Sequence, residues 1–307
     1  MTRPGPGWRS GFVGMAIFSA SLPATRLALA GFPPLFLTSA RAVVAALLGA
    51  ALLALGRAAR PARCDLGPLA VVALGVVVGF PLLTAVALRS MTAAHSVVFV
   101  GLLPLATALC GVLRGGERPG PLFWAFSGAG AAVVVAFATG RDGASTLTGD
   151  ALMLAAVAVC GLGYAEGAVL TRRLGGWQSI CWALLLALPV MAVTALLAAP
   201  ASLASVGGPA WAGLAYVSVF SMLVGFVFWF RGLARGGIAG VGQLQLLQPF
   251  LGLTLSALLL HEAVSWPMLA ASAATVLCVA GAKRHARRPE RSMPTGDPAP
   301  AAVKQAI

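Results

Sequence analysis

Apolar runs of about 20 residues, each long enough to cross the roughly 30 Å hydrocarbon core of a bilayer, recur along this 307-residue chain. Inside lipid, only helices or a closed barrel satisfy the backbone hydrogen bonds. The runs are continuous rather than alternating, which is typical of helices and not of barrel strands. Only 9% of the residues are charged, against roughly 25% in a soluble domain. The sequence therefore predicts an all-α membrane protein.

We interpret the apolar runs as ten transmembrane helices. They cover about Gly11 to Leu29, Pro34 to Leu55, Gly67 to Leu88, Ala93 to Leu113, Pro121 to Thr139, Gly149 to Leu170, Gln178 to Ala199, Ala210 to Phe230, Gly237 to Leu260 and Ser265 to Ala282. The first run could be read as a signal peptide, since Ala28-Leu29-Ala30 resembles a cleavage site. Removing it would leave nine helices and break the division described next.

Two stretches of the chain share one layout, in which a proline is followed by a glutamate 13 residues later. Pro104 and Glu117 belong to the fourth run, and Pro249 and Glu262 belong to the ninth; a shift of 145 residues lays each pair on the other. Because both pairs occupy the same part of an apolar run, we interpret the chain as two related halves of five helices each.

This division predicts five segments along the chain. They are an N-terminal segment (1–10), a first five-helix repeat (11–139), a linker loop (140–148), a second five-helix repeat (149–282) and a basic, Pro-rich tail that is expected to be disordered (283–307).

The positions of the positive charges predict the orientation. With the N-terminus inside, the inner segments hold 17 of the 21 Lys and Arg residues, the outer loops hold Arg89 and Arg141, and Arg26 and Arg41 lie within helices. Positive residues favour the cytoplasmic side, so both termini are expected there, in the plasma membrane. Five helices per half is an odd number, so the halves would cross in opposite senses, as inverted repeats do. This placement explains the net charge of +13 by contact with lipid headgroups, without nucleic acid as a partner.

No catalytic or metal-binding pattern is present in the sequence. The five cysteines form no CxxC pair, the histidines and acidic residues are few, and no P-loop, GxSxG or HExxH occurs. We therefore expect no cofactor, no metal and no enzymatic activity.

Four features together resemble the EamA-type branch of the drug/metabolite transporter superfamily. They are the five-plus-five plan, the repeated proline and glutamate, Arg41 early in the second run, and Tyr164 followed by Arg172 and Arg173 at the end of the sixth. The first run departs from the family pattern, because Phe18 to Pro23 stand where a tryptophan-glycine pair is common. The resemblance implies a transporter of amino acids, other small metabolites or toxic compounds. Without an ATP-binding motif, its transport would be passive or driven by an ion or proton gradient.

Two arginines lie within predicted helices, where a charge costs roughly 2.5–3.5 kcal/mol at the helix centre. Arg41 is a candidate for binding a substrate carboxylate or for helix packing, and the alternative is that it extends to the outer headgroups. For Arg26, nearer its helix end, we favour that extension to the headgroups.

Other polar residues are candidates for a substrate cavity. Glu166 could bind a proton or a cation, or pair with an arginine such as Arg172, Arg173 or Arg235. Gln245 and Gln248 share a helix face beside Pro249 and could line a cavity or bond between helices, and the same question applies to Gln243. Tyr164 and Trp229 are candidates for cavity walls, with anchoring at the interface as the alternative for Trp229.

The remaining candidates lie at helix ends or at the prolines. Pro104 and Pro249 are expected to break or gate their helices, and Glu117 and Glu262 to act as end-caps or gate pairs. His95 is expected to be solvated or to cap its helix near the outer face.

These features favour a secondary transporter that exports small metabolites, amino acids first, by alternating access, acting as a monomer or a homodimer. Efflux of cationic drugs is the alternative on the same fold. A membrane-embedded enzyme and a non-transporting scaffold are the alternatives of another class.

Overall fold

The computed structural model describes residues 6–115, 120–139, 146–236 and 241–285, and no β-strand occurs in these ranges. Eight of the described helices are long and apolar enough to cross a membrane. They are Gly7–Ala28, Pro34–Leu55, Arg63–Ala87, Ala93–Leu113, Pro121–Ala138, Leu147–Leu174, Gln178–Leu197 and Gly208–Gly232. Two shorter apolar helices, Leu244–Leu260 and Trp266–Ala282, follow them. The predicted all-helical, multi-pass character is confirmed.

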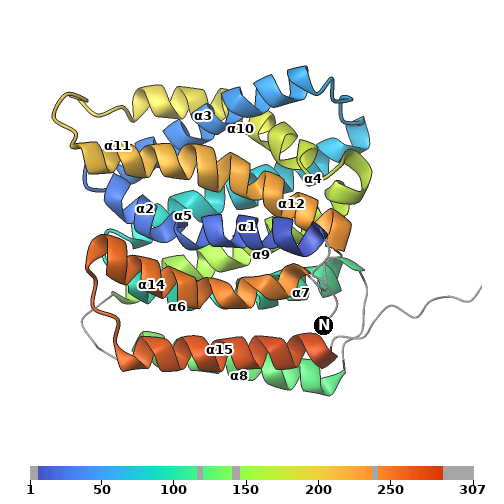
Figure 1. The fold of residues 1–307 in the computed structure, drawn as a ribbon, viewed down its shortest axis with the longest axis vertical. Helices are drawn as coiled ribbons and strands as arrows, with labels where there is room; N and C mark the ends of the chain where they lie inside the picture. Colours follow the sequence, from blue (N-terminus) through green and yellow to red (C-terminus); the bar gives the residue numbers. More distant parts are fainter. Residues whose placement is uncertain (1–5, 116–119, 140–145, 237–240, 286–307) are drawn as a thin grey trace, which may run out of the picture.

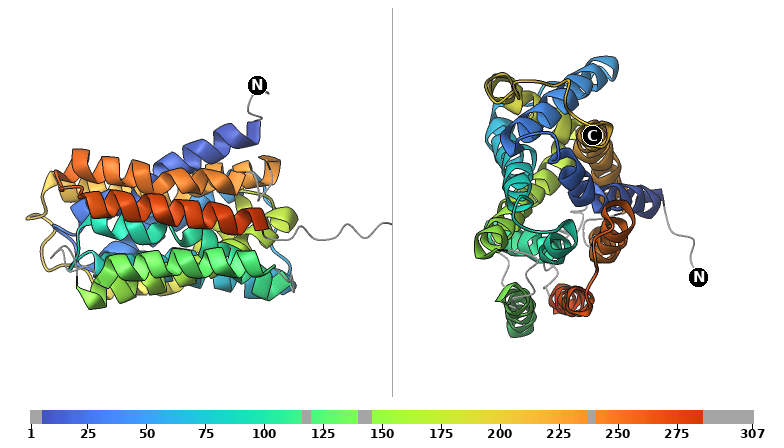
Figure 2. Two further views of the ribbon diagram at one scale, coloured as in Figure 1. Left: turned by 90° about the horizontal axis from the view of Figure 1, so that it is seen from below. Right: turned by 90° about the vertical axis from the view of Figure 1, so that its left-hand side faces the viewer.

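The helices lie side by side with their axes along one common direction (Figure 1). At one edge of the bundle α3 (Pro34–Leu55) packs along α10 (Gln178–Leu197), and at the other α8 (Pro121–Thr139) packs along α15 (Trp266–His285) (Figures 1 and 2). The start of α1 (Pro6–Ser19) and the end of α15 lie at the same end of the bundle, on the right in Figure 1.

Contacts between the two halves of the chain occur in equivalent pairs. In one pair, α1 from the start of the first half packs on α12 (Gly225–Gly236). In the other, α9 (Leu147–Leu174) from the start of the second half packs on α4 (Leu66–Val72) and α5 (Phe80–Ala87). The first helix of each half thus packs on the third apolar run of the other half, as expected when one motif is used twice.

The third run of each half contains a wide, π-helical segment. In the first half, the short 3₁₀ turn η1 (Arg63–Asp65) and α4 lead into η2 (Ala73–Gly79). In the second half, α11 (Gly208–Ala215) leads into η3 (Tyr216–Val224). The two π segments end 145 residues apart, so the spacing seen in the sequence also relates their backbones. Such segments are rare and frequently lie at functional sites.

The fourth and ninth runs are interrupted beside Pro104 and Pro249. In the fourth run, α6 (Ala93–Val100) and α7 (Leu103–Gly115) are separated at Gly101 and Leu102. In the ninth, the 3₁₀ segment η4 (Gly242–Leu247) precedes α14 (Gln248–Leu260). The ninth run is therefore not one continuous helix, and its break lies directly before Pro249, the residue expected to break or gate it.

The cause of both interruptions is the same. Pro104 and Pro249 are each the second residue of the following helix, where the lost N–H is tolerated, whereas further inside a helix the ring would clash with the preceding turn. α6 packs on α14 and α7 packs on η4, and a side-chain carbon placed on Gly101 would lie 3.5 Å from Pro249. The two breaks therefore lie next to each other.

The first run is also divided, although a single helix was expected there. It consists of α1 and α2 (Ser21–Ala28), which meet at Ala20. Pro23 supplies the reason, because its ring opposes the carbonyl of Ser19 and its nitrogen cannot donate to it. The Ser19 hydroxyl bonds the Met15 carbonyl at 2.9 Å.

Glycines allow helices from the two halves to touch through their backbones. A Cβ atom on Gly75 in η2 would lie 2.5 Å from the carbonyl oxygen of Val159 in α9, and one on Gly14 in α1 would lie 2.8 Å from the backbone nitrogen of Trp229 in α12. No side chain fits at either point, so these contacts fix how closely the halves approach.

Candidate functional site

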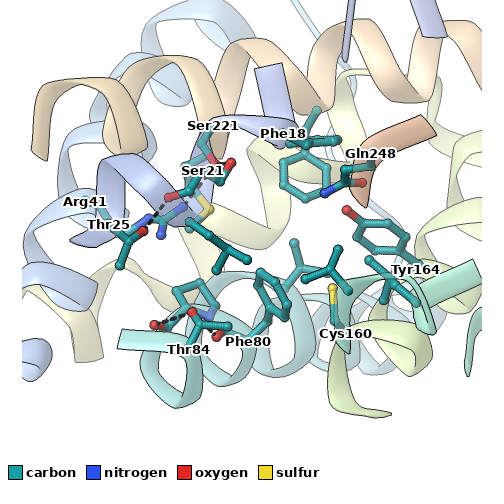
Figure 3. A pocket seen from close by; sticks show the side chains of 17 residues that line it. Phe18, Ser21, Thr25, Arg41, Phe80, Thr84, Cys160, Tyr164, Ser221 and Gln248 are labelled. Atoms are coloured by element: carbon teal, nitrogen blue, oxygen red, sulfur yellow. Dashed lines mark hydrogen bonds between the residues drawn. The ribbon is translucent and has the colours of Figure 1, made fainter. Parts of the chain in front are cut away.

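A narrow cavity lies where the irregular backbone segments of the two halves meet (Figure 3). The space open to the centres of water molecules is about 40 Å³, which is room for about three waters. The cavity is lined by Phe18, Ser21, Leu22, Thr25, Arg41, Val76, Phe80, Pro81, Thr84, Val100, Leu103, Cys160, Tyr164, Ser221, Met222, Phe226 and Gln248. Since typical ligand pockets enclose about 300–1,000 Å³, this conformation is nearly closed.

The lining includes the ends of the interrupted helices. Val76 belongs to η2 and Ser221 to η3, while Val100 ends α6, Leu103 begins α7 and Gln248 begins α14. Backbone irregularity is tolerated at membrane depth where it lines a cavity. The chain therefore places its breaks and π segments around this cavity.

Arg41 is the charged residue of the cavity. It comes from α3, is only 6% exposed, and its Nη2 donates to the Ser221 hydroxyl at 3.3 Å. Its Nε has no hydrogen-bond partner, and among the described residues no carboxylate forms an ion pair with it. A buried guanidinium therefore faces the cavity with donors available to an anion (Figure 3).

Hydroxyl groups surround this guanidinium. The Ser21 and Ser221 hydroxyls are 2.7 Å apart and join α2 to η3, and the Thr25 hydroxyl donates to the Ser21 carbonyl at 2.7 Å. Thr84 lies further along the lining and donates to the Phe80 carbonyl at 2.7 Å. These groups can rotate to donate to a ligand or accept from it.

Aromatic rings from both halves form a wall of the cavity. Phe18 and Phe226 have ring centroids 4.8 Å apart, and Tyr164 meets Phe226 edge-on at 5.9 Å. Trp229 packs behind them against Phe18 at 6.3 Å and is 2% exposed, so it is buried rather than interfacial.

The sequence-predicted cavity residues divide into two groups. Arg41, Tyr164 and Gln248 line the cavity, whereas Glu166 and Gln245 are buried but are not among its lining residues. Gln243 belongs to η4, and its side chain lies outside the described part of the chain.

Arg41 is buried in the cavity and does not follow the alternative of extending to the headgroups. Arg26, for which that extension was favoured, differs from the prediction. Arg26 is half-buried and donates from Nη1 to the carbonyl oxygen of Leu88 at the end of α5. A cation is favoured there because carbonyl groups at a helix C-terminus lack partners. Arg173 binds Asp65 at 3.0 Å rather than serving Glu166.

Sequence reasoning missed the serines and threonines of the cavity. Ser21, Thr25, Thr84 and Ser221 look the same in the sequence as Ser127, whose hydroxyl simply bonds the carbonyl four residues earlier at 2.6 Å. The one available signal is the four-residue spacing of Ser21 and Thr25, which places both on one helix face.

Glu262 caps a helix of the other half. Its two carboxylate oxygens accept from the backbone N–H groups of Ala93 (3.0 Å) and Ala94 (2.7 Å), at the start of α6. These N–H groups have no partner inside the helix, and an anion at this end is also favoured by the helix dipole. Glu117, its counterpart, lies outside the described residues.

We expect Glu262→Ala to destabilise the protein by about 1–2 kcal/mol, because two helix-end donors lose their acceptor. Glu262→Gln keeps one acceptor oxygen, so its stability should lie between that of Glu262→Ala and that of the parent. Thermal unfolding of the purified protein in detergent measures both changes. An alanine variant as stable as the parent would contradict the capping role.

His95 is buried, contrary to the expectation of a solvated or capping residue. Its side chain is 3% exposed, its Nε2 lies 3.1 Å from Asp150 Oδ1 at the start of α9, and its ring stacks on Phe137 with centroids 4.5 Å apart. Asp150 lies 55 residues further along the chain, so sequence position alone did not reveal the pair. It ties α6 of one half to α9 of the other.

A cavity with a buried arginine and several hydroxyl groups, at the meeting point of interrupted helices in an all-helical membrane protein, is typical of membrane transporters. The sequence matches the EamA-like transporter family over residues 7–139 and again over 147–282. The chain therefore belongs to the EamA-like transporter family, within the drug/metabolite transporter superfamily. This membership indicates a transporter rather than an enzyme.

Two individual comparisons agree with this assignment. The uncharacterized transporter YdeK of Bacillus subtilis (strain 168) is 58% identical over 287 residues, which are 94% of this chain and 100% of that relative. A solved structure, described only as the crystal structure of a protein, matches with a TM-score of 0.63 and 22% identity over 92% of this chain and 99% of its own. At that identity the likeness concerns the fold alone.

Proposed function

We propose that this protein is a secondary transporter that exports small metabolites carrying a carboxylate, with amino acids as the first class to test. The observation that carries the proposal is Arg41, a buried guanidinium with an unpaired Nε that faces a cavity between the two halves. Leaving such a charge without a counter-ion is costly. A carboxylate that binds two of its N–H groups would remove that cost.

The mechanism in this proposal is alternating access. Ten transmembrane helices form two inverted repeats, and the cavity is reached from one side and then from the other as the halves rock. The equivalent contact pairs, the matched π segments and the adjacent breaks at Pro104 and Pro249 support this arrangement. Energy comes from the substrate gradient or from an ion or proton gradient.

Cationic drugs are less favoured substrates in this proposal. Among the lining residues the formal charge belongs to Arg41 and no carboxylate is present. A cation would therefore meet a like charge, which is unfavourable in a medium of low dielectric constant.

Transport in reconstituted vesicles tests the proposal. Vesicles that contain the protein would hold unlabelled compound inside, and the labelled compound would be added outside. The panel would comprise amino acids, other small carboxylates and cationic drugs, and each would be measured with and without a proton gradient. We expect saturable exchange of at least one carboxylate. If folded and correctly inserted protein exchanged none of the compounds, the proposal would be contradicted.

The proposed orientation, with both termini in the cytoplasm of the plasma membrane, can be tested with Cys64. It is exposed and precedes α4, whereas the other four cysteines are half-buried or buried. A membrane-impermeant maleimide should label Cys64 in inside-out vesicles and not in intact cells. Ser202→Cys, exposed in the α10–α11 connection, should show the reverse in a Cys64→Ser background. Labelling of Cys64 in intact cells would contradict the orientation.

A further inference from the structure

The residues that line the cavity carry a positive formal charge and no negative one. Arg41 is the charged residue among those that line it. The described acidic side chains lie elsewhere. Asp65 pairs with Arg173, Asp150 pairs with His95, Glu262 caps α6, and Glu166 is buried outside the lining.

This imbalance separates three kinds of ligand that otherwise have the same shape. A monoanion cancels the charge of Arg41 and leaves the occupied cavity neutral. A zwitterion, such as an α-amino acid, binds Arg41 equally well but brings an ammonium group for which the lining offers no counter-charge. A cation adds a second positive charge. Because an uncompensated charge away from water is costly, the three should bind in that order.

The cavity also has two polar ends. Figure 3 shows Arg41 with Ser21, Thr25 and Ser221 on one side, and Tyr164 with Gln248 on the opposite side. Tyr164 and Gln248 are neutral, and each can both donate and accept a hydrogen bond. The second end therefore suits a hydroxyl or an amide of the ligand rather than another charge.

Most of the other lining residues are apolar. They include Leu22, Val76, Phe80 and Met222, and the tilted rings of Phe18 and Phe226, whose centroids are 4.8 Å apart, add an aromatic wall. Such a surface favours an apolar or aromatic ligand body, which gains by leaving water.

We propose that the substrate is a monoanionic organic acid without a free amino group, with an apolar or aromatic middle and a neutral polar group at its far end. This inference rests on the proposed transport function and keeps its carboxylate, but it replaces amino acids as the first class to test with acids that have no amino group. Arg41 binds the carboxylate, the aromatic wall contacts the middle, and Gln248 with Tyr164 binds the far end. Such a molecule is larger than the closed cavity of about 40 Å³, so the proposal requires the cavity to widen when the substrate binds.

Four compounds with one common frame test the proposal. They are 3-(4-hydroxyphenyl)propionate, tyrosine, tyramine and 3-phenylpropionate, which are respectively the anion, the zwitterion, the cation and the anion without the far hydroxyl. Binding to the purified full chain would be measured at pH 7 by competition and by thermal shift, and transport by exchange in vesicles. We expect tyrosine to bind at least ~10-fold more weakly than the hydroxylated anion, with tyramine weakest.

The far end is tested separately with Gln248→Leu. The unmodified protein should prefer 3-(4-hydroxyphenyl)propionate over 3-phenylpropionate by about 3- to 10-fold, the worth of one buried hydrogen bond. In Gln248→Leu that preference should shrink, while the preference for the anion over tyrosine should persist because Arg41 is intact. Loss of both preferences together would contradict the assignment of the two ends.

The results distinguish a wrong substrate class from a wrong transport function. If tyrosine or tyramine binds as well as the anion, the substrate class is wrong while transport stands. If none of the four compounds binds but another metabolite of the panel is exchanged, the substrate class is again wrong and the transporter function is kept. If no compound of the panel moves at all, the proposed function fails with it.

Discussion

Replacing Arg41 by Gln is expected to weaken the binding of a carboxylate substrate by ~10- to ~100-fold, because a hydrogen bond to a charged group is worth about 1.5–3 kcal/mol. The same variant should be at least as stable as the parent without substrate, since it removes a buried charge that has a single hydrogen bond, to Ser221. Half-saturating concentration in exchange transport and unfolding temperature in detergent measure the two effects.

Arg41→Lys is the matched control. It keeps the positive charge but loses the planar, two-pronged donor group, so it should bind the substrate with intermediate affinity. An Arg41 that served only helix packing would behave differently. Its replacement by Gln would then lower the unfolding temperature and leave the substrate affinity as it was.

The second large effect is expected from Gly75→Ala. The added methyl carbon would lie 2.5 Å from the carbonyl oxygen of Val159 and 3.1 Å from the Cα of Gly163, and both are backbone atoms that no side-chain rotation can move. The halves must then separate locally, so we expect a loss of about 3 kcal/mol or more, above the usual cost of overpacking. Thermal unfolding and the yield of monodisperse protein measure it.

Gly128→Ala controls for the substitution itself. Gly128 lies in α8, and a methyl group there meets nothing within 4 Å. Alanine also favours helix more than glycine does, so this variant should be as stable as the parent or slightly more so. Equal stability of both alanine variants would show that the approach of η2 to α9 is not a constraint.

The sequence predicted the apolar helices and the breaks beside Pro104 and Pro249, but not the division of the first run at Ala20, and the reason for the successes is physical. An apolar run of membrane length leaves the backbone few alternatives to a helix, and a proline acts on its own helix through local sterics. For this reason the positions of α6, α7 and α14 and the role of Pro249 could be inferred from residues that are close together in the chain.

The candidate site was only partly predictable, because its contacts join distant residues. A buried charge such as Arg41 is visible in the sequence, since it interrupts an apolar run. The partner of Arg41, Ser221, lies 180 residues away, and a serine within a helix most often bonds its own backbone. In the same way, the burial of His95 depends on Asp150 and Phe137, which no local pattern connects to it.

Pro23, which divides the first run into α1 and α2, has no counterpart in the second half. The residue 145 positions further on is Ala168, and α9 passes through it without interruption. Because the halves differ in this way, neither can adopt the exact conformation of the other. If the protein works by rocking, the arrangements that open to the two sides of the bilayer differ in free energy even when nothing is bound. An empty carrier would then rest preferentially on one side, and Pro23→Ala is expected to change that preference.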